Sequence, residues 1–297
     1  MRGTTTIRKK NFIKKIQPGY IYSSFLGRPA YFVLVFLSLV LVLFPLYWLI
    51  LCAVKIPIDV LANPPVFFPR LITFDNFKSL FNRNNITHIS SNSLIVTFVS
   101  TFISTFFGSM TAYAISRGVL AKKIRNFCAF WFLLQKMYPA IATAIPVYYV
   151  VRYLRMLDTL GALIIMNVSF NLPLVIWIMI GFYENIPRGM EESAEIEGCN
   201  LAQTFFLIVV PITQAGMIAA AILSFVGTWN EFLFAVILTI KNSKTLPVVV
   251  AGFITDKGLD WGPMSAAAFI IIIPVVIVVW LLQKNFVSGL TMGAMKE

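Results

Sequence analysis

The chain has 297 residues, 59% of them hydrophobic and only 12% charged, with a formal net charge of +12. So few charges over so much apolar sequence exclude a water-soluble enzyme or binding domain. A basic chain can also bind nucleic acid, but no basic segment here alternates with aromatic residues on a polar face. We therefore expect membrane lipid around the chain and no nucleic-acid partner.

Six apolar stretches reach the length of about 20 residues that a helix needs to cross the hydrocarbon core of a bilayer. Each is expected to be helical, because a lipid-exposed segment must satisfy its own backbone hydrogen bonds. The sequence therefore predicts an all-α integral membrane protein with a six-helix domain over 31–285, a basic N-terminal segment over 1–30 and a tail over 286–297. The six predicted spans are about 31–53, 94–115, 127–151, 160–182, 214–239 and 264–283.

The basic residues predict which ends of the spans face the cytoplasm. If the N-terminus is inside, the inside segments carry 14 Lys and Arg residues and the outside loops nine. Positive charge close to a span is retained on the cytoplasmic side, so both termini are expected there. The bias is strongest in the N-terminal segment and after the second span, at Arg8, Lys9, Lys10, Lys14, Lys15, Arg117, Lys122, Lys123 and Arg125.

A polar, acidic stretch over about 185–211 lies between the fourth and fifth spans, on the predicted cytoplasmic side. Asn185 is expected to cap a first helix, Gly198 to end it in a left-handed conformation, and a second short helix to run from about Asn200 to Pro211. An amphipathic helix lying on the membrane is the alternative, but anionic lipid would repel its carboxylates. The candidate docking residues are Glu191, Glu192, Ser193, Ala194 and Gly198.

The same stretch resembles the EAA loop of permease subunits in type I ABC importers. Glu192, Ser193 and Ala194 fall on the E-A-A triplet and Gly198 on the glycine of that loop, although Ser193 replaces an alanine. Residues 92–118, the Trp-Asn-Glu-Phe sequence at 229–232 and the tail at 286–296 resemble the second permease subunit of the maltose and carbohydrate-uptake systems. The trailing apolar positions of the loop are matched by Phe205, Ile208 and Pro211.

This resemblance implies a permease subunit that pairs with a homologous permease, two ATPase subunits and an extracytoplasmic solute-binding protein. The candidate docking residues would contact an ATPase. The complex would import a sugar or oligosaccharide through the inner or plasma membrane of a prokaryote. No cofactor is expected in this chain, because ATP and Mg would be bound by the partner ATPase subunits.

Two charged residues, Lys136 and Glu231, lie within or near the predicted spans, where a charge is costly unless it faces protein or water. With Trp229, Asn230 and Tyr138 they form a candidate substrate path, in which Trp229 or Tyr138 would stack on a sugar. The alternative is that both charges pair with polar groups at a subunit interface or reach the outer headgroups. The recurrence of Trp-Asn-Glu-Phe across the resembled family, whatever the substrate, favours this alternative.

Catalytic and metal-ligating patterns are absent from the sequence. It has no phosphate-binding loop of the G-x-x-x-x-G-K-[ST] type, no nucleophile-base-acid set and only one histidine, His88. We therefore predict a transport subunit without enzymatic activity. A secondary transporter remains an alternative, although no paired repeat is visible, as does an ABC permease for a non-sugar solute such as a glycerol phosphodiester.

Overall fold

The computed structural model describes residues 28–118, 121–255 and 258–294, and the predicted spans are helical apart from breaks at 138–139 and 230–232. Within these residues, five helices are long and apolar enough to cross a membrane. Four of them contain the first, second, fourth and sixth predicted spans, and the fifth is a continuous run over Leu201–Trp229. The first four are α3 (Arg28–Val54), α6 (Ile86–Arg117), α9 (Leu160–Glu184) and α15 (Trp261–Ala294).

The third predicted span is not one straight helix. It consists of α7 (Lys122–Met137) and α8 (Ala140–Tyr153), which meet at an angle of 91°. A proline disfavours helical geometry in the residue before it, and Tyr138, which precedes Pro139, is accordingly extended with ψ of 130°. Counted as one broken span, the pair brings the number of crossings in the described residues to six.

The fifth span begins earlier and ends earlier than the predicted range 214–239. Helix α11 (Leu201–Gln203) continues through the π-helical segment η1 (Thr204–Val209) into α12 (Val210–Trp229), so the predicted separate helix from Asn200 to Pro211 is wrong. Pro211 lies just after the π-helical turn and lacks the backbone N–H that a regular ladder would use. After Trp229 the chain turns, and a distinct helix, α13 (Leu233–Leu238), follows.

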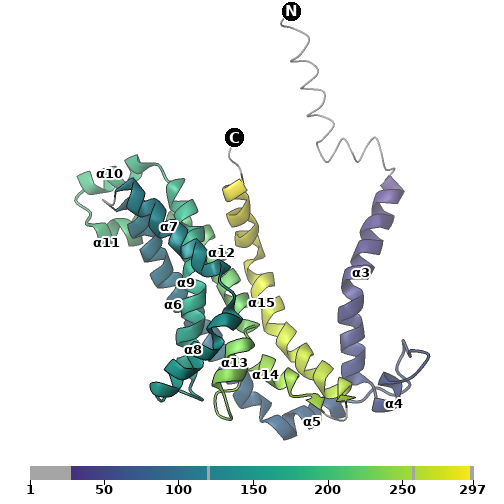
Figure 1. Cartoon of the computed structure of the whole chain (residues 1–297). Helices are drawn as coiled ribbons and strands as arrows, with labels where there is room; N and C mark the ends of the chain where they lie inside the picture. The colour runs from purple at the N-terminus through teal and green to yellow at the C-terminus, as the bar shows by residue number, and fades with distance from the viewer. Residues whose placement is uncertain (1–27, 119–120, 256–257, 295–297) are drawn as a thin grey trace, which may run out of the picture.

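The remaining elements are short and lie at the end of the molecule opposite the loop after α9 (Figure 1). They are α4 (Pro57–Val60), α5 (Asp75–Asn84), α14 (Leu246–Ala251) and a two-stranded antiparallel sheet of β1 (Ile254–Thr255) and β2 (Gly258–Leu259).

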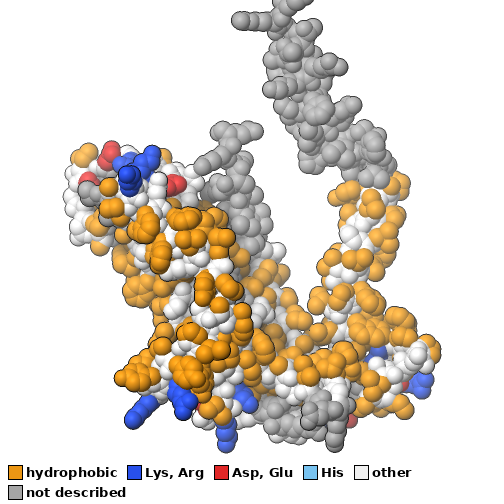
Figure 2. All heavy atoms as spheres, viewed as in Figure 1, with side chains coloured by type: hydrophobic (Ala, Val, Ile, Leu, Met, Phe, Trp, Pro, Cys, Tyr) orange, Lys and Arg blue, Asp and Glu red, His pale blue; other side chains and the backbone are white. Residues whose placement is uncertain are grey.

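Helix α6 packs along α9 and α12, α12 also packs on α15, and α15 contacts α3. Figure 1 shows the start of α3, the loop helix α10 (Arg188–Ile196) and the end of α15 at the same end of the molecule. Figure 2 shows apolar side chains covering the helices between two ends where charged side chains gather. This distribution is that of a chain spanning a bilayer.

Small residues allow the central helices to approach closely. Gly216 of α12 is buried, and a Cβ there would lie 2.5 Å from the ring of Phe182 in α9. The same face of α12 continues through Ala220, Ser224 and Thr228, all buried. Close packing at small residues is how helices associate in membranes, where lipid is as apolar as the helices themselves.

The predicted terminal segments are covered only in part. Residues 1–27 of the basic segment 1–30 lie outside the described residues. Residues 295–297, at the end of the tail, also lie outside them. The backbone of the tail from 286 to 294 continues α15 without a break.

Candidate functional site

The loop after the fourth span forms a short exposed helix, α10 (Arg188–Ile196), which ends at a tight turn. Gly198 has φ of +89°, and the backbone N–H groups of Gly198 and Cys199 donate to the carbonyls of Glu195 and Ala194. This pattern is the left-handed helix ending that a glycine permits without a steric penalty. The expected turn at Gly198 is thus present. Asn185 does not cap α10, since its side chain donates back to Gly181 at the end of α9.

The helix that follows begins with a reciprocal cap. The side chain of Asn200 accepts from the backbone N–H of Gln203 at 2.9 Å, and the Gln203 side chain accepts from the Asn200 N–H at 2.8 Å. A cap of this kind contributes about 1 kcal/mol. The Asn-x-x-Gln spacing after a glycine is a signal for it, which sequence reasoning did not use. Together, the turn at Gly198 and the Asn200–Gln203 cap fix the angle between α10 and the continuous helix Leu201–Trp229.

The outward face of α10 combines carboxylates with apolar side chains. Glu192, Ser193 and Glu195 of α10 and Glu197 just after it are exposed. Ile196, at the end of α10, and Leu201, at the start of α11, have 87% and 71% of their surface in solvent. Exposed apolar side chains beside charged ones are typical of a surface that another protein covers. Sequence reasoning missed the two apolar residues. Ala194, in contrast, is buried against its own chain, so its small size serves internal packing.

Glu191 points into the protein and not toward solvent. Its Oε1 lies 2.9 Å from Nε of Arg117, the last residue of α6, and its Oε2 accepts from the Tyr113 hydroxyl at 3.2 Å. Arg117 also donates through Nη2 to the carbonyls of Tyr183 and Ile186, each at 2.6 Å. Glu191 therefore anchors α10 to the ends of α6 and α9. We expected Glu191 on the docking surface, and the structure instead turns its carboxylate inward. Arg117 and Tyr113 were not identified from sequence as partners of the loop.

Trp229, proposed as a residue that stacks on substrate, is buried in the core. Its ring stacks on Phe225 with centroids 6.0 Å apart, and Nε1 donates to the carbonyl of Ile271 in α15 at 2.9 Å. No face of this indole is open to a sugar. Asn230 is exposed and donates back to Val226 at 2.9 Å.

The carboxylate of Glu231 is held by the backbone of the following helix. Its two oxygens accept from the N–H groups of Phe234 at 2.7 Å and Ala235 at 3.0 Å, so it caps the start of α13. Glu231 and Trp229 also line a cavity of about 10 Å³, which has room for a single water molecule. These contacts favour the interpretation that Glu231 pairs with polar groups of the protein.

Lys136 and Tyr138 lie at the bend between α7 and α8. Both are exposed, and Nζ of Lys136 approaches the Phe170 carbonyl of α9 at 3.4 Å. The structure does not bring these two residues together with Trp229 and Glu231 in one cavity. Among the described residues, no group of three or more His, Cys, Asp or Glu side chains is placed to hold a metal ion.

At the opposite end of the molecule, Asp158 fixes the loop after α13. Its carboxylate accepts from the backbone N–H groups of residues 240–243 at 3.0–3.2 Å, and from the side chains of Asn242 and Ser243. Partial burial raises the pKa of Asp158, but the hydrogen bonds to the charged form outweigh it and hold the pKa well below its usual range. The loop is therefore anchored by an ionised carboxylate at neutral pH.

Five helices long and apolar enough to cross a membrane, with the broken α7–α8 pair as a sixth candidate among the described residues, define a multi-pass membrane protein that exposes a loop helix at one end. Comparison with known proteins identifies the family within this class. The chain belongs to the family described as binding-protein-dependent transport system inner membrane components, which it matches over residues 104–291.

Individual relatives agree with this membership. The chain is 36% identical to a probable ABC transporter permease protein of Sinorhizobium fredii, over 86% of this chain and 90% of the relative. It is 34% identical to a diacetylchitobiose uptake system permease protein of Streptomyces coelicolor, over 89% and 94%. Among solved structures, a bacterial ABC transporter that imports alginate has a chain with a TM-score of 0.71 at 22% identity, over 88% of this chain and 99% of that one. The last likeness supports the fold.

Proposed function

We propose that this chain is the transmembrane permease subunit of an ATP-driven importer for a sugar or oligosaccharide. With a homologous permease it forms the translocation pathway, an extracytoplasmic solute-binding protein delivers the substrate, and two separate ATPase subunits hydrolyse ATP. Membership of a binding-protein-dependent family supports the delivery step. Relatives named for diacetylchitobiose and trehalose transport support a carbohydrate substrate.

The observation that carries the ATPase assignment is the outward face of α10. Its carboxylates at Glu192, Glu195 and Glu197 surround apolar side chains that no part of the described chain covers, Ile196 foremost. An isolated chain gains nothing from exposing Ile196, whereas a partner that buries it gains hydrophobic free energy. Because α10 is joined rigidly to α6, α9 and α12, a partner bound there can move the transmembrane helices.

If an ATPase binds α10, this end of the protein faces the cytoplasm. The proposed orientation in the membrane therefore has α10 and both termini in the cytoplasm and α4, α5 and α14 outside. Cysteine labelling tests it in a variant that lacks Cys52, Cys128 and Cys199. A membrane-impermeant probe should label Lys78→Cys, on α5, in intact cells, and should label Lys123→Cys only after the membrane is opened. The reverse pattern would overturn the proposed orientation.

The transport function is tested by reconstitution of this chain with its co-encoded permease, ATPases and binding protein in proteoliposomes. We expect uptake of one member of a labelled oligosaccharide panel to need ATP on the α10 side and binding protein on the other. Vesicles without this chain, and vesicles with an ATPase that binds but does not hydrolyse ATP, are the controls. Solute accumulation by this chain alone under a proton or sodium gradient would instead identify a secondary transporter.

A further inference from the structure

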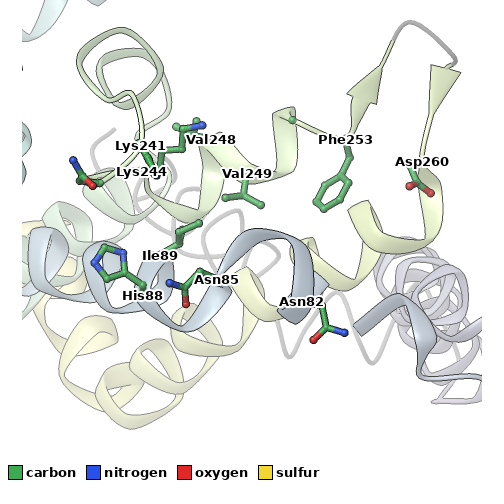
Figure 3. Close-up of a pocket in the computed structure, with 12 residues that line it drawn as sticks. Asn82, Asn85, His88, Ile89, Lys241, Lys244, Val248, Val249, Phe253 and Asp260 are labelled. Atoms are coloured by element: carbon green, nitrogen blue, oxygen red, sulfur yellow. The ribbon is translucent and has the colours of Figure 1, made fainter. Parts of the chain in front are cut away.

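A cleft of about 720 Å³ opens at the end of the molecule opposite α10 (Figure 3). Its walls come from the junction of α5 and α6, which contributes Asn85 and His88, from the loop after α13 and from α14. The loop contributes Lys241 and Lys244, and Asp260 lies at the start of α15. We call this space the outer cleft.

The loop that carries the two lysines is held in place from both sides. Asp158 binds the backbone of residues 240–243 from the α8–α9 connection. From α6, the Asn92 side chain donates to the carbonyls of Asn242 and Lys244 at 2.8 and 3.1 Å, and Ser93 accepts from the backbone N–H of Leu246 at 2.8 Å. Binding residues are often presented by loops on a rigid scaffold, which lowers the entropy lost on association.

The charges of the outer cleft are unbalanced. The ion pairs found among the described residues do not include Lys241 or Lys244. Figure 3 shows Asp260, the one carboxylate among the described residues of the lining, far from both lysines across the cleft. Lys241 is exposed and Lys244 half-buried, so both ammonium groups are available to a partner. The lysine end of the cleft is thus a rigid rim whose two ammonium groups form no ion pair among the described residues, while the Asp158 carboxylate is engaged by the backbone of the same loop.

We propose that the outer cleft receives an acidic segment of the solute-binding protein, whose carboxylates pair with Lys241 and Lys244. This inference rests on the proposed function, which places the cleft outside the cell and makes transport depend on a binding protein. A protein segment fits the cleft better than a free solute does. Small-molecule sites are predominantly apolar, whereas amides, an imidazole and ammonium groups line much of this one.

Charges at the rim of an interface act mainly through long-range attraction, which steers the partner and is screened by salt. Reversing both charges should therefore raise the concentration of binding protein needed for a given response and remove much of its salt dependence. The maximal rate at saturating binding protein should change little, because neither lysine contacts the groups that join α10 to the transmembrane helices.

The experiment uses the complete complex in nanodiscs and measures ATP hydrolysis against the concentration of loaded binding protein, at low and high ionic strength. We expect Lys241→Glu/Lys244→Glu to raise the half-saturating concentration about tenfold or more, and Lys241→Arg/Lys244→Arg to stay within about twofold of the parent. The matched control is Lys78→Glu, an exposed lysine of α5 whose only ion-pair partner among the described residues is Asp75; it should also behave like the parent.

The outcomes separate this inference from the function on which it rests. A parent complex that responds to the binding protein, together with a charge-reversed variant that responds identically, overturns the docking role of the outer cleft alone. The same holds if charge reversal changes only the handling of free solute in the absence of binding protein. A parent complex that no binding protein stimulates overturns the proposed function and this inference together.

Discussion

Arg117 ends the second transmembrane helix, and its guanidinium Nε lies 2.9 Å from the Glu191 carboxylate of the exposed loop helix α10. The same guanidinium donates to the last carbonyls of the α9 region, so one side chain joins α6, α9 and α10. Only 10% and 14% of the two side chains is exposed. A charge left alone at such a position would be poorly solvated, and the pair therefore holds the loop helix in a fixed orientation.

Removal of Arg117 should loosen the loop without preventing membrane insertion. We expect Arg117→Ala to destabilise this end of the protein by about 3 kcal/mol, because Glu191 and two carbonyls lose their partner. Glu191→Gln keeps the size of the side chain and one acceptor oxygen, although it replaces the other oxygen by an amide donor and removes the charge, and it should cost less. Thermal unfolding of the detergent-solubilised complex measures both, with the exposed Glu195→Gln as control. Equal stability of Arg117→Ala and the parent would show that the pair does not anchor α10.

Substitutions at two neighbouring residues of α10 distinguish a role in internal packing from a role in docking. Ala194 is buried and Ser193 exposed on the same helix. Ala194→Trp should overpack the chain itself and lower thermal stability, at a cost of about 1–3 kcal/mol or more. Ser193→Trp should leave stability nearly unchanged but reduce co-purification of the ATPase subunits. If Ser193→Trp retains the ATPases as well as the parent does, the outward face of α10 is not the docking surface.

Gly198 should be sensitive to backbone geometry and not to side-chain volume. Its φ is +89°, yet a Cβ at this position would meet no atom within 4 Å. We expect Gly198→Val to cost about 1 kcal/mol or more in backbone strain, to misdirect α10 and to reduce ATP hydrolysis stimulated by the binding protein. Gly198→Asn should be milder, because asparagine tolerates left-handed conformations better. A stimulated rate for Gly198→Val equal to that of the parent would contradict this.

The pH dependence of the loop after α13 follows from the lowered pKa of Asp158. A carboxyl group with a depressed folded-state pKa contributes stability that is complete above its unfolded pKa of about 3.9 and is lost as the pH falls through the folded value. Hydrogen exchange of the amides of residues 240–243 should therefore show no loss of protection attributable to Asp158 from neutral pH down to about pH 5. Asp158→Asn should make these amides exchange faster throughout that range. Unchanged exchange in Asp158→Asn would refute the anchoring role.

Substitution of Trp229 tests whether this residue belongs to the core or to a substrate path. Trp229→Phe retains an aromatic ring but loses the hydrogen bond to Ile271, so we expect a loss of stability of about 1 kcal/mol. The concentration of sugar-loaded binding protein that half-saturates uptake should stay unchanged. A large change in sugar selectivity with unchanged stability would instead place the indole beside the substrate.

Hydropathy was sufficient to locate the unbroken membrane helices in the sequence, because length and apolarity alone decide whether a segment can cross a bilayer. It could not locate the 91° bend of the third span, since a window average over 127–151 does not register the backbone restriction that Pro139 imposes on Tyr138. The end of the fifth span was missed for a similar reason. Residues 233–238 are apolar and extend the hydropathy signal beyond the turn at Asn230.

The loop was predictable in position and in its turn at Gly198, which a local backbone requirement determines. Which side chains face outward was not, because the rotation of α10 about its axis depends on contacts far apart in sequence. Glu191 and Glu192 are adjacent and chemically alike, yet only Glu191 meets Arg117. The burial of Trp229 likewise depends on α15, more than 40 residues further along the chain.

The uninterrupted helix from Leu201 to Trp229 has a mechanical consequence. At 1.5 Å per residue its 29 residues form a rod of roughly 43 Å, with one end beside the turn at Gly198 and the other locked into the aromatic stack of Phe225 and Trp229. A tilt imposed at the end beside Gly198 must therefore displace the far end in proportion to the length of the rod. The hydrogen bond from Trp229 to Ile271 would pass that displacement on to the last helix of the chain.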